Sequence, residues 1–168
     1  YESSKKEHLS VLTNAGLFDT SHMAFVMVSG KDAYQLLQYC FTNDMDSCVG
    51  KNKTPLSAGR CAYGAFLNER GHVIDDSIVY KFSDDQFMAV VNAGMGSTIA
   101  GHLESLRKGR EAEIVDLTDK VGKIDVQGPI SAKILSRLLA NAESVFDAMP
   151  YFSFKGHFDS SSPLSESV

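Results

Sequence analysis

The sequence predicts an α+β fold, in which an antiparallel β-meander sheet carries flanking helices. Strand-like segments follow one another at residues 60–67, 73–82 and 86–93, with only short turns between them. Helical spacing of apolar residues appears only outside this stretch. Strands that succeed one another without intervening helices indicate α+β and not a doubly wound sheet. The 168 residues are enough for one domain with a substantial core.

A helix, a strand and a second helix are predicted before the meander, and in order they span residues 5–12, 24–28 and 29–40. Gly16 is a stop signal after the first helix. Ser29 and Asp32 stand close to a capping box, and the apolar residues that follow have the spacing of a core-facing helix. Residues 45–57 are polar and contain glycine and proline, which predicts a loop.

The meander contains a turn at residues 68–71, in which Gly71 supplies a positive φ angle, and a tight connection at residues 83–85. Beyond the meander we expect a helix, two strands and a further helix, at residues 97–108, 112–117, 123–127 and 129–140. Pro129 suits the first turn of the last helix. Residues 1–155 are predicted to form one domain, and the serine-rich residues 156–168 a mobile tail with few contacts.

Composition and charge exclude several classes of protein. Lys and Arg number 16 against 21 Asp and Glu, and a net charge of −5 argues against sequence-independent nucleic-acid binding. No apolar run of membrane-spanning length occurs, and no secretory signal is apparent. The three cysteines form no CxxC pair, which favours a reducing compartment. We therefore expect no membrane association and a cytoplasmic location, or the mitochondrial matrix in a eukaryote.

Asp76 interrupts the more apolar face of the predicted strand 73–82. Period-two alternation places it on the same face as Ile74, Ile78 and Tyr80. An ionised carboxylate on an apolar face is costly unless it is hydrogen-bonded or paired, and proteins accept that cost mainly at functional sites. Asp76 is therefore predicted to be a buried carboxylate with a functional role.

The register of the next hairpin predicts a partner for this carboxylate. A three-residue loop centred on Asp84 pairs Phe82 with Gln86, and the same register places Asn92 opposite Asp76. Two polar side chains within an apolar patch are typical of a small-molecule site. The alternative is an Asp–Asn pair that only satisfies its own hydrogen bonds in the core.

Other chemical motifs are weak or absent. His72 lies near Asp75 and Asp76, but no further ligand spacing supports a metal site. The sequence contains neither GxGxxG nor GxxxxGK[ST], so the common phosphate-binding loops are missing.

Four motifs resemble the glycine cleavage system T-protein (aminomethyltransferase) family, and the resemblance covers residues 1–155. They are GLFDTSHM at 16–23, LNERGHVIDD at 67–76, VVNA at 90–93 and VQGP at 126–129. The resemblance implies the folate-binding domain of this family, and with it tetrahydrofolate-dependent one-carbon transfer. It also implies a partner, the lipoyl-carrying H-protein of the glycine cleavage system.

The resemblance also implies roles for individual residues. Asp76 corresponds to the family's central residue, which lies near the folate amine nitrogens and assists proton movement. Asn92 corresponds to a pterin contact. Met23, Tyr63 and Tyr80 correspond to positions that line the folate cavity, although core packing alone would also explain these three.

Family members are longer, and this chain lacks their later motif S-R-x-G-Y-T-G-E-x-G. The isolated chain is therefore expected to be incomplete and inactive as an enzyme. Two alternatives stay open within the resemblance. One is the folate-accepting part of a dimethylglycine, sarcosine or sulfonium demethylase. The other is a non-catalytic folate-binding protein of iron–sulfur maintenance.

Overall fold

A computed structural model describes residues 2–139, 142–147 and 149–156. Contacts divide the chain into two compact units. We call residues 1–21, 122–150 and 155–168 the first unit, and residues 22–121 and 151–154 the second unit. The predicted domain over residues 1–155 thus contains two compact units, and the predicted tail lies, from residue 157 on, outside the described residues.

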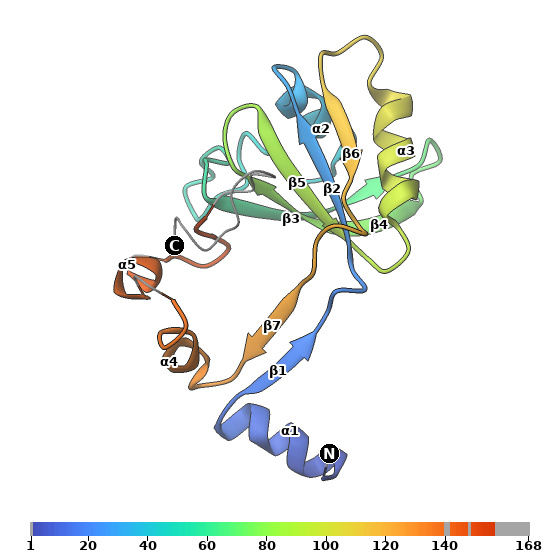
Figure 1. Cartoon of the computed structure of the whole chain (residues 1–168). Helices are drawn as coiled ribbons and strands as arrows, with labels where there is room; N and C mark the ends of the chain where they lie inside the picture. The colour runs from blue at the N-terminus through green and yellow to red at the C-terminus, as the bar shows by residue number, and fades with distance from the viewer. Residues whose placement is uncertain (1, 140–141, 148, 157–168) are drawn as a thin grey trace. The chain divides into compact units, whose positions relative to one another are not determined.

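The second unit is built on a five-stranded antiparallel sheet with the order β3-β4-β5-β2-β6 (Figure 1). Its strands are β2 (Ala24–Ser29), β3 (Arg60–Leu67), β4 (Val73–Lys81), β5 (Gln86–Val91) and β6 (Glu113–Asp116). The consecutive strands β3, β4 and β5 are the predicted meander. β2 joins the sheet between β5 and β6, so hydrogen bonds between segments far apart in sequence complete it. The antiparallel α+β fold is thereby confirmed.

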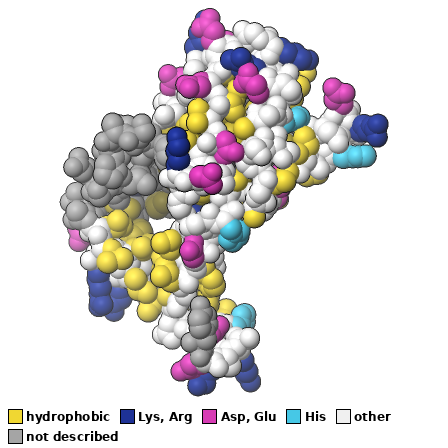
Figure 2. Space-filling view, turned by 45° about the vertical axis from the view of Figure 1, so that its right-hand side comes forward, with side chains coloured by type: hydrophobic (Ala, Val, Ile, Leu, Met, Phe, Trp, Pro, Cys, Tyr) yellow, Lys and Arg dark blue, Asp and Glu magenta, His cyan; other side chains and the backbone are white. Residues whose placement is uncertain are grey.

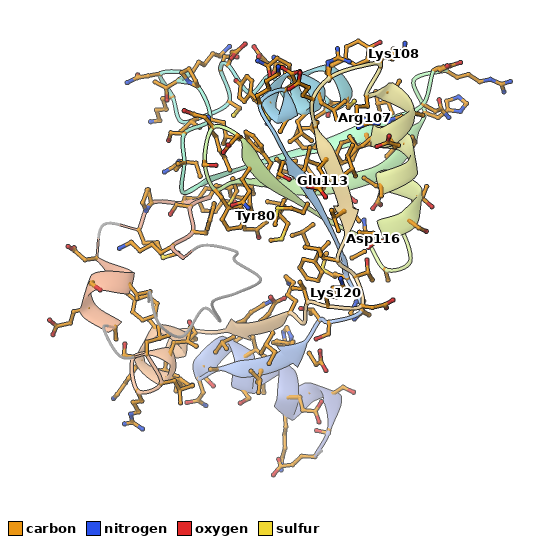
Figure 3. All side chains as sticks on the ribbon, turned by 45° about the horizontal axis from the view of Figure 1, so that its top comes forward. Tyr80, Arg107, Lys108, Glu113, Asp116 and Lys120 are labelled. Carbon is orange, nitrogen blue, oxygen red and sulfur yellow. The ribbon has the colours of Figure 1, made fainter. Side chains whose placement is uncertain are left out.

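Helices α2 (Ala33–Cys40) and α3 (Gly96–Leu106) pack on one face of this sheet. The predicted spacing in α2 is confirmed, because Ala33, Leu36, Leu37 and Cys40 are its buried residues. They form one core with alternate residues of the strands, such as Val26 and Val79. At the edge of the sheet, β6 carries Glu113 and Asp116, while Arg107 and Lys108 follow α3 (Figure 3).

The predicted capping box is wrong. Ser29 is the last residue of β2, and Asp32 occupies the N-cap of α2 without a side-chain capping bond. The Asp32 carboxylate instead accepts a hydrogen bond from the backbone N–H of Glu111, at 2.8 Å. This long-range bond ties the start of α2 to the segment that leads into β6.

The first unit contains a two-stranded antiparallel sheet and three short helices. Its elements are α1 (Ser4–Thr13), β1 (Gly16–Asp19), β7 (Ile124–Gln127), α4 (Ser131–Leu135) and α5 (Ala142–Phe146). Gly16 begins a strand paired with Gln127 and does not simply end a helix. Neither β1 nor α5 was predicted, and the last predicted helix is much shorter in the structure. None of the described residues in these helices is buried.

Two smaller predictions are confirmed. Residues 45–57 form a loop with one isolated bridge, and Gly71 has a φ of 77°. In the described parts of the chain, no helix has the length and apolar character needed to span a bilayer.

Candidate functional site

The predicted site residues gather on one face of the second unit's sheet, the face opposite α2 and α3. We call it the site face. In β3 and β4, Tyr63 pairs with Ile78. Tyr80, labelled in Figure 3, lies two residues beyond Ile78 on the same side of the sheet. Asp76 lies two residues before Ile78, again on this side. Met23 and Asn92 directly flank the last pair of β2 and β5, Ala24 with Val91.

The predicted hairpin register is confirmed. Ile78 pairs with Val90, and the N–H of Phe82 donates to the carbonyl oxygen of Gln86 at 2.9 Å. Beyond the end of the ladder, Nδ2 of Asn92 donates to Oδ1 of Asp76 at 2.7 Å. The two predicted partners are therefore in direct contact.

The predicted burial of Asp76 is wrong. Asp76 is exposed, and the buried residue is its neighbour Asp75, which lies on the helix-covered face with Ser77 and Val79. Polar side chains can be buried on this face because groups on the adjacent strand are their hydrogen-bond partners. The hydroxyl of Ser77, for example, donates to the carbonyl oxygen of Val90 at 3.0 Å. Counting apolar side chains therefore selected the wrong face as the interior.

Two neutral donors hold the Asp76 carboxylate. The hydroxyl of Tyr63 donates to Oδ2 at 2.8 Å, and the Asn92 amide donates to Oδ1. These bonds, that of Tyr63 most of all, hold the pKa of Asp76 below its usual value. The same bond raises the pKa of Tyr63. Asp76 is consequently a negatively charged acceptor at neutral pH.

Sequence reasoning did not assign a role to Asp75. Its Oδ2 accepts the backbone N–H of Asn92 at 2.8 Å, and its Oδ1 accepts the Asn92 side-chain amide at 2.7 Å. Adjacent strand residues point to opposite faces, so Asp75 and Asp76 approach Asn92 from two sides. The twin aspartates opposite a strand end were the signal that could have revealed this contact.

Apolar side chains make up much of the rest of the site face. Phe25 and Val90 form a buried pair on the site face, and the ring of Tyr80 packs edge-on against Phe154 at a centroid distance of 5.3 Å. Met23, two residues before Phe25 in the chain, is half-buried. An apolar surface with one charged acceptor suits a planar ligand that carries N–H donors.

Metal ligands do not assemble anywhere in the part of the chain that the structure describes. No group of three or more His, Cys, Asp or Glu residues is placed to hold an ion there. The cysteines are free, and burial raises the pKa of Cys40 to about 11 and that of Cys61 to about 12. These two thiols are therefore protonated at neutral pH and poorly nucleophilic.

The fold is thus α+β, with a site face that carries one charged acceptor among apolar side chains. The family model for the GCVT N-terminal domain matches residues 1–160. The chain belongs to this family, which is that of the glycine cleavage T-protein. This confirms the family resemblance of the four motifs.

Individual relatives agree with the family assignment. An aminomethyltransferase of Clostridium botulinum is 38% identical over 133 residues, which is 79% of this chain and 34% of the relative. An aminomethyltransferase of Thermus thermophilus is 37% identical over 138 residues, covering 82% of this chain and 37% of the relative.

A solved structure shows the same fold. The crystal structure of the glycine cleavage system aminomethyltransferase T from Bartonella henselae has a TM-score of 0.69 and 33% sequence identity, covering 79% of this chain and 34% of that chain. The chain thus spans about a third of the length of the relatives that it matches. The predicted aminomethyltransferase type of fold is confirmed.

Proposed function

We propose that this chain provides the folate-binding part of a tetrahydrofolate-dependent aminomethyltransferase of the glycine cleavage system. The observation that carries the proposal is the charged Asp76 carboxylate, held by Tyr63 and Asn92 on an otherwise apolar sheet face. The relatives named aminomethyltransferase support the same reaction class. The donor in this reaction is the aminomethyl group carried on the lipoyl arm of the H-protein, which is the proposed partner.

The residues present fit a reduced folate. When bound, tetrahydrofolate supplies the amine nitrogens that accept the one-carbon unit. The apolar side chains of Met23 and Tyr80 offer contacts for the ring system, and Asn92 offers a polar contact for its edge. Asp76 has an unused lone pair on each oxygen, since each accepts one bond from the protein. It can thus accept an amine N–H from the folate.

Asp76 acts mainly through its charge. A carboxylate with a lowered pKa is a weak base, so it keeps its negative charge close to the amine as positive charge develops there. It also provides a site for the proton that the amine loses when a new carbon–nitrogen bond forms. Tyr63 and Asn92 hold the carboxylate in one orientation, so this stabilisation needs no rearrangement.

Replacement of the carboxylate by an amide tests the proposal. In a chimera with residues 1–155 in place of the matching part of the Thermus thermophilus relative, Asp76→Asn should slow single-turnover methylene transfer from aminomethyl-loaded H-protein by about 10²- to 10⁴-fold. Tetrahydrofolate affinity should change much less. The control is Glu69→Gln, the same change on an exposed turn residue. Equal rates for Asp76→Asn and the parent chimera would remove Asp76 from the mechanism.

The same assay separates the alternatives. Transfer from a methyl donor such as dimethylglycine or sarcosine, without transfer from H-protein, would indicate a demethylase relative. Folate binding without transfer from any donor would indicate a non-catalytic relative, as in iron–sulfur maintenance. The free cysteines fit the reducing environment of the cytoplasm or the mitochondrial matrix, where we place the protein.

A further inference from the structure

Both oxygens of the buried Asp75 carboxylate accept hydrogen bonds from a single residue. Asp75 is 8% exposed, and its two oxygens accept the backbone N–H and the side-chain amide of Asn92, at 2.8 and 2.7 Å. Among the described residues, neither Asp75 nor Asp76 forms an ion pair with Lys, Arg or His. Asp75 therefore acts on the site face only through Asn92.

This contact fixes which way the Asn92 amide points. Nδ2 carries two hydrogens, and they go to Oδ1 of Asp75 and Oδ1 of Asp76, each at 2.7 Å. A carboxylate accepts hydrogen bonds and does not donate them, so only the nitrogen of the amide can lie between the two carboxylates. Oδ1 of Asn92 is turned away from both, and it accepts no bond from the described residues.

Every side-chain donor hydrogen of Tyr63 and Asn92 bonds to one of the two aspartates, so none is left for a ligand. The Tyr63 hydroxyl hydrogen goes to Asp76, both Asn92 amide hydrogens go to the two aspartates, and the Asn92 backbone N–H goes to Asp75. What this group presents to a ligand is lone pairs alone, on Asp76, on Asn92 and on the Tyr63 oxygen. Such a surface favours a ligand edge rich in N–H groups and disfavours one rich in bare nitrogens.

We propose that Asp75 is a positioning residue that orients Asn92, and that the resulting acceptor-only surface selects reduced over oxidised folate. This rests on the proposed function. The reduced pyrazine ring of tetrahydrofolate carries hydrogen on both of its nitrogens, whereas the same nitrogens in folic acid are bare acceptors. A bare nitrogen facing Asp76 or Oδ1 of Asn92 leaves two acceptors opposed, which costs affinity.

Asp75→Asn tests the positioning role. The new side chain keeps an oxygen for the backbone N–H of Asn92 but offers an N–H₂ where Oδ1 had accepted. The Asn92 amide can then no longer satisfy position 75 and Asp76 together. With Nδ2 inward it opposes the new N–H₂ group, and with Oδ1 inward it opposes the Asp76 carboxylate, so its orientation is no longer fixed. We expect the preference for tetrahydrofolate over folic acid, measured anaerobically on this chain as a ratio of dissociation constants, to fall by about 10- to 100-fold.

The orientation has its own readout in the same chain. In the unmodified protein, NMR should show both side-chain amide protons of Asn92 protected from exchange with water. In Asp75→Asn, at least one of them should exchange freely. The control is Ser77→Ala, which removes a buried hydrogen bond from the same face of β4 without touching Asn92. This control should keep both the protection and the folate preference.

A double substitution separates positioning from general loss of stability. Asn92→Ala should lower the folate preference as Asp75→Asn does, and adding Asp75→Asn to it should change the preference no further. An unchanged preference in Asp75→Asn, or a further loss in the double variant, would overturn the inference alone. Failure of the unmodified chain to bind tetrahydrofolate at all would overturn the proposed function as well.

Discussion

The hydrogen bond from the Tyr63 hydroxyl lowers the pKa of Asp76 more than any other contact does. Removing it with Tyr63→Phe should raise the pKa of Asp76 toward its usual value, because the bond stabilises only the charged form. The carboxylate would then become protonated at a higher pH than in the unmodified protein. An NMR titration of the Asp76 carboxyl carbon measures the change directly.

The sign of the accompanying stability effect follows from the lowered pKa. Asp76 stabilises the fold above the pKa it has in the unfolded chain, and this contribution is lost as the pH falls through its lower folded-state pKa. Tyr39→Phe, the same change at an exposed tyrosine of α2, is the control and should leave the Asp76 titration where it was. An identical titration curve in Tyr63→Phe would contradict the assigned cause.

Within single elements, we expect a glycine-to-alanine substitution to have opposite effects on stability at two positions. A Cβ on Gly64 of β3 would lie 2.7 Å from the ring of Phe41, so Gly64→Ala forces that buried ring to move and should destabilise the protein by about 1–3 kcal/mol. Gly101 lies within α3 with open space around it. Gly101→Ala should stabilise the protein by roughly 0.5–1 kcal/mol, since glycine is a poor helix former.

Urea denaturation followed by circular dichroism measures both free energies of unfolding. The two variants add the same methyl group, so each controls for the other. If Gly64→Ala proved as stable as the parent, Phe41 would have to lie away from β3. If Gly101→Ala lost stability, the surroundings of α3 would not be open as described.

At the scale of the whole molecule, the two units differ in how much apolar surface they bury. The second unit has a core that includes Leu36, Phe66 and Phe87, whereas no residue of β1 or β7 is buried. Leu17 and Ile124 are exposed there, and Figure 2 shows hydrophobic side chains at the surface of the first unit. An isolated two-stranded sheet is marginally stable in water.

Hydrogen exchange should therefore distinguish the units. We expect the backbone amides of β1 and β7 to exchange through local opening, with protection well below that of β2, β4 and β5. Mass spectrometry after peptic digestion resolves these segments, and the exposed tip of the 45–57 loop, at residues 50–53, provides an internal reference for fast exchange. Equal protection in β7 and β5 would show that the first unit has a core of its own.

Local sequence patterns were sufficient to define the meander and its register. Alternation and turn residues determine where β3, β4 and β5 lie, and a three-residue loop leaves one pairing that keeps like faces together. That pairing brought Asn92 to Asp76, and the resemblance to the family added Tyr63, Tyr80 and Met23 on the same face. These features rest on short-range geometry or on residue identity, both of which a sequence carries directly.

Tertiary structure alone decided which face is buried and what β1 does. The burial of Asp75 depends on two helices that cover its side of the sheet and on the amide and N–H groups of Asn92, which offset the loss of water. β1 is a strand because Gly16–Asp19 meets Ile124–Gln127 from the far end of the chain. Both outcomes depend on contacts between residues distant in sequence, whose energies no local pattern records.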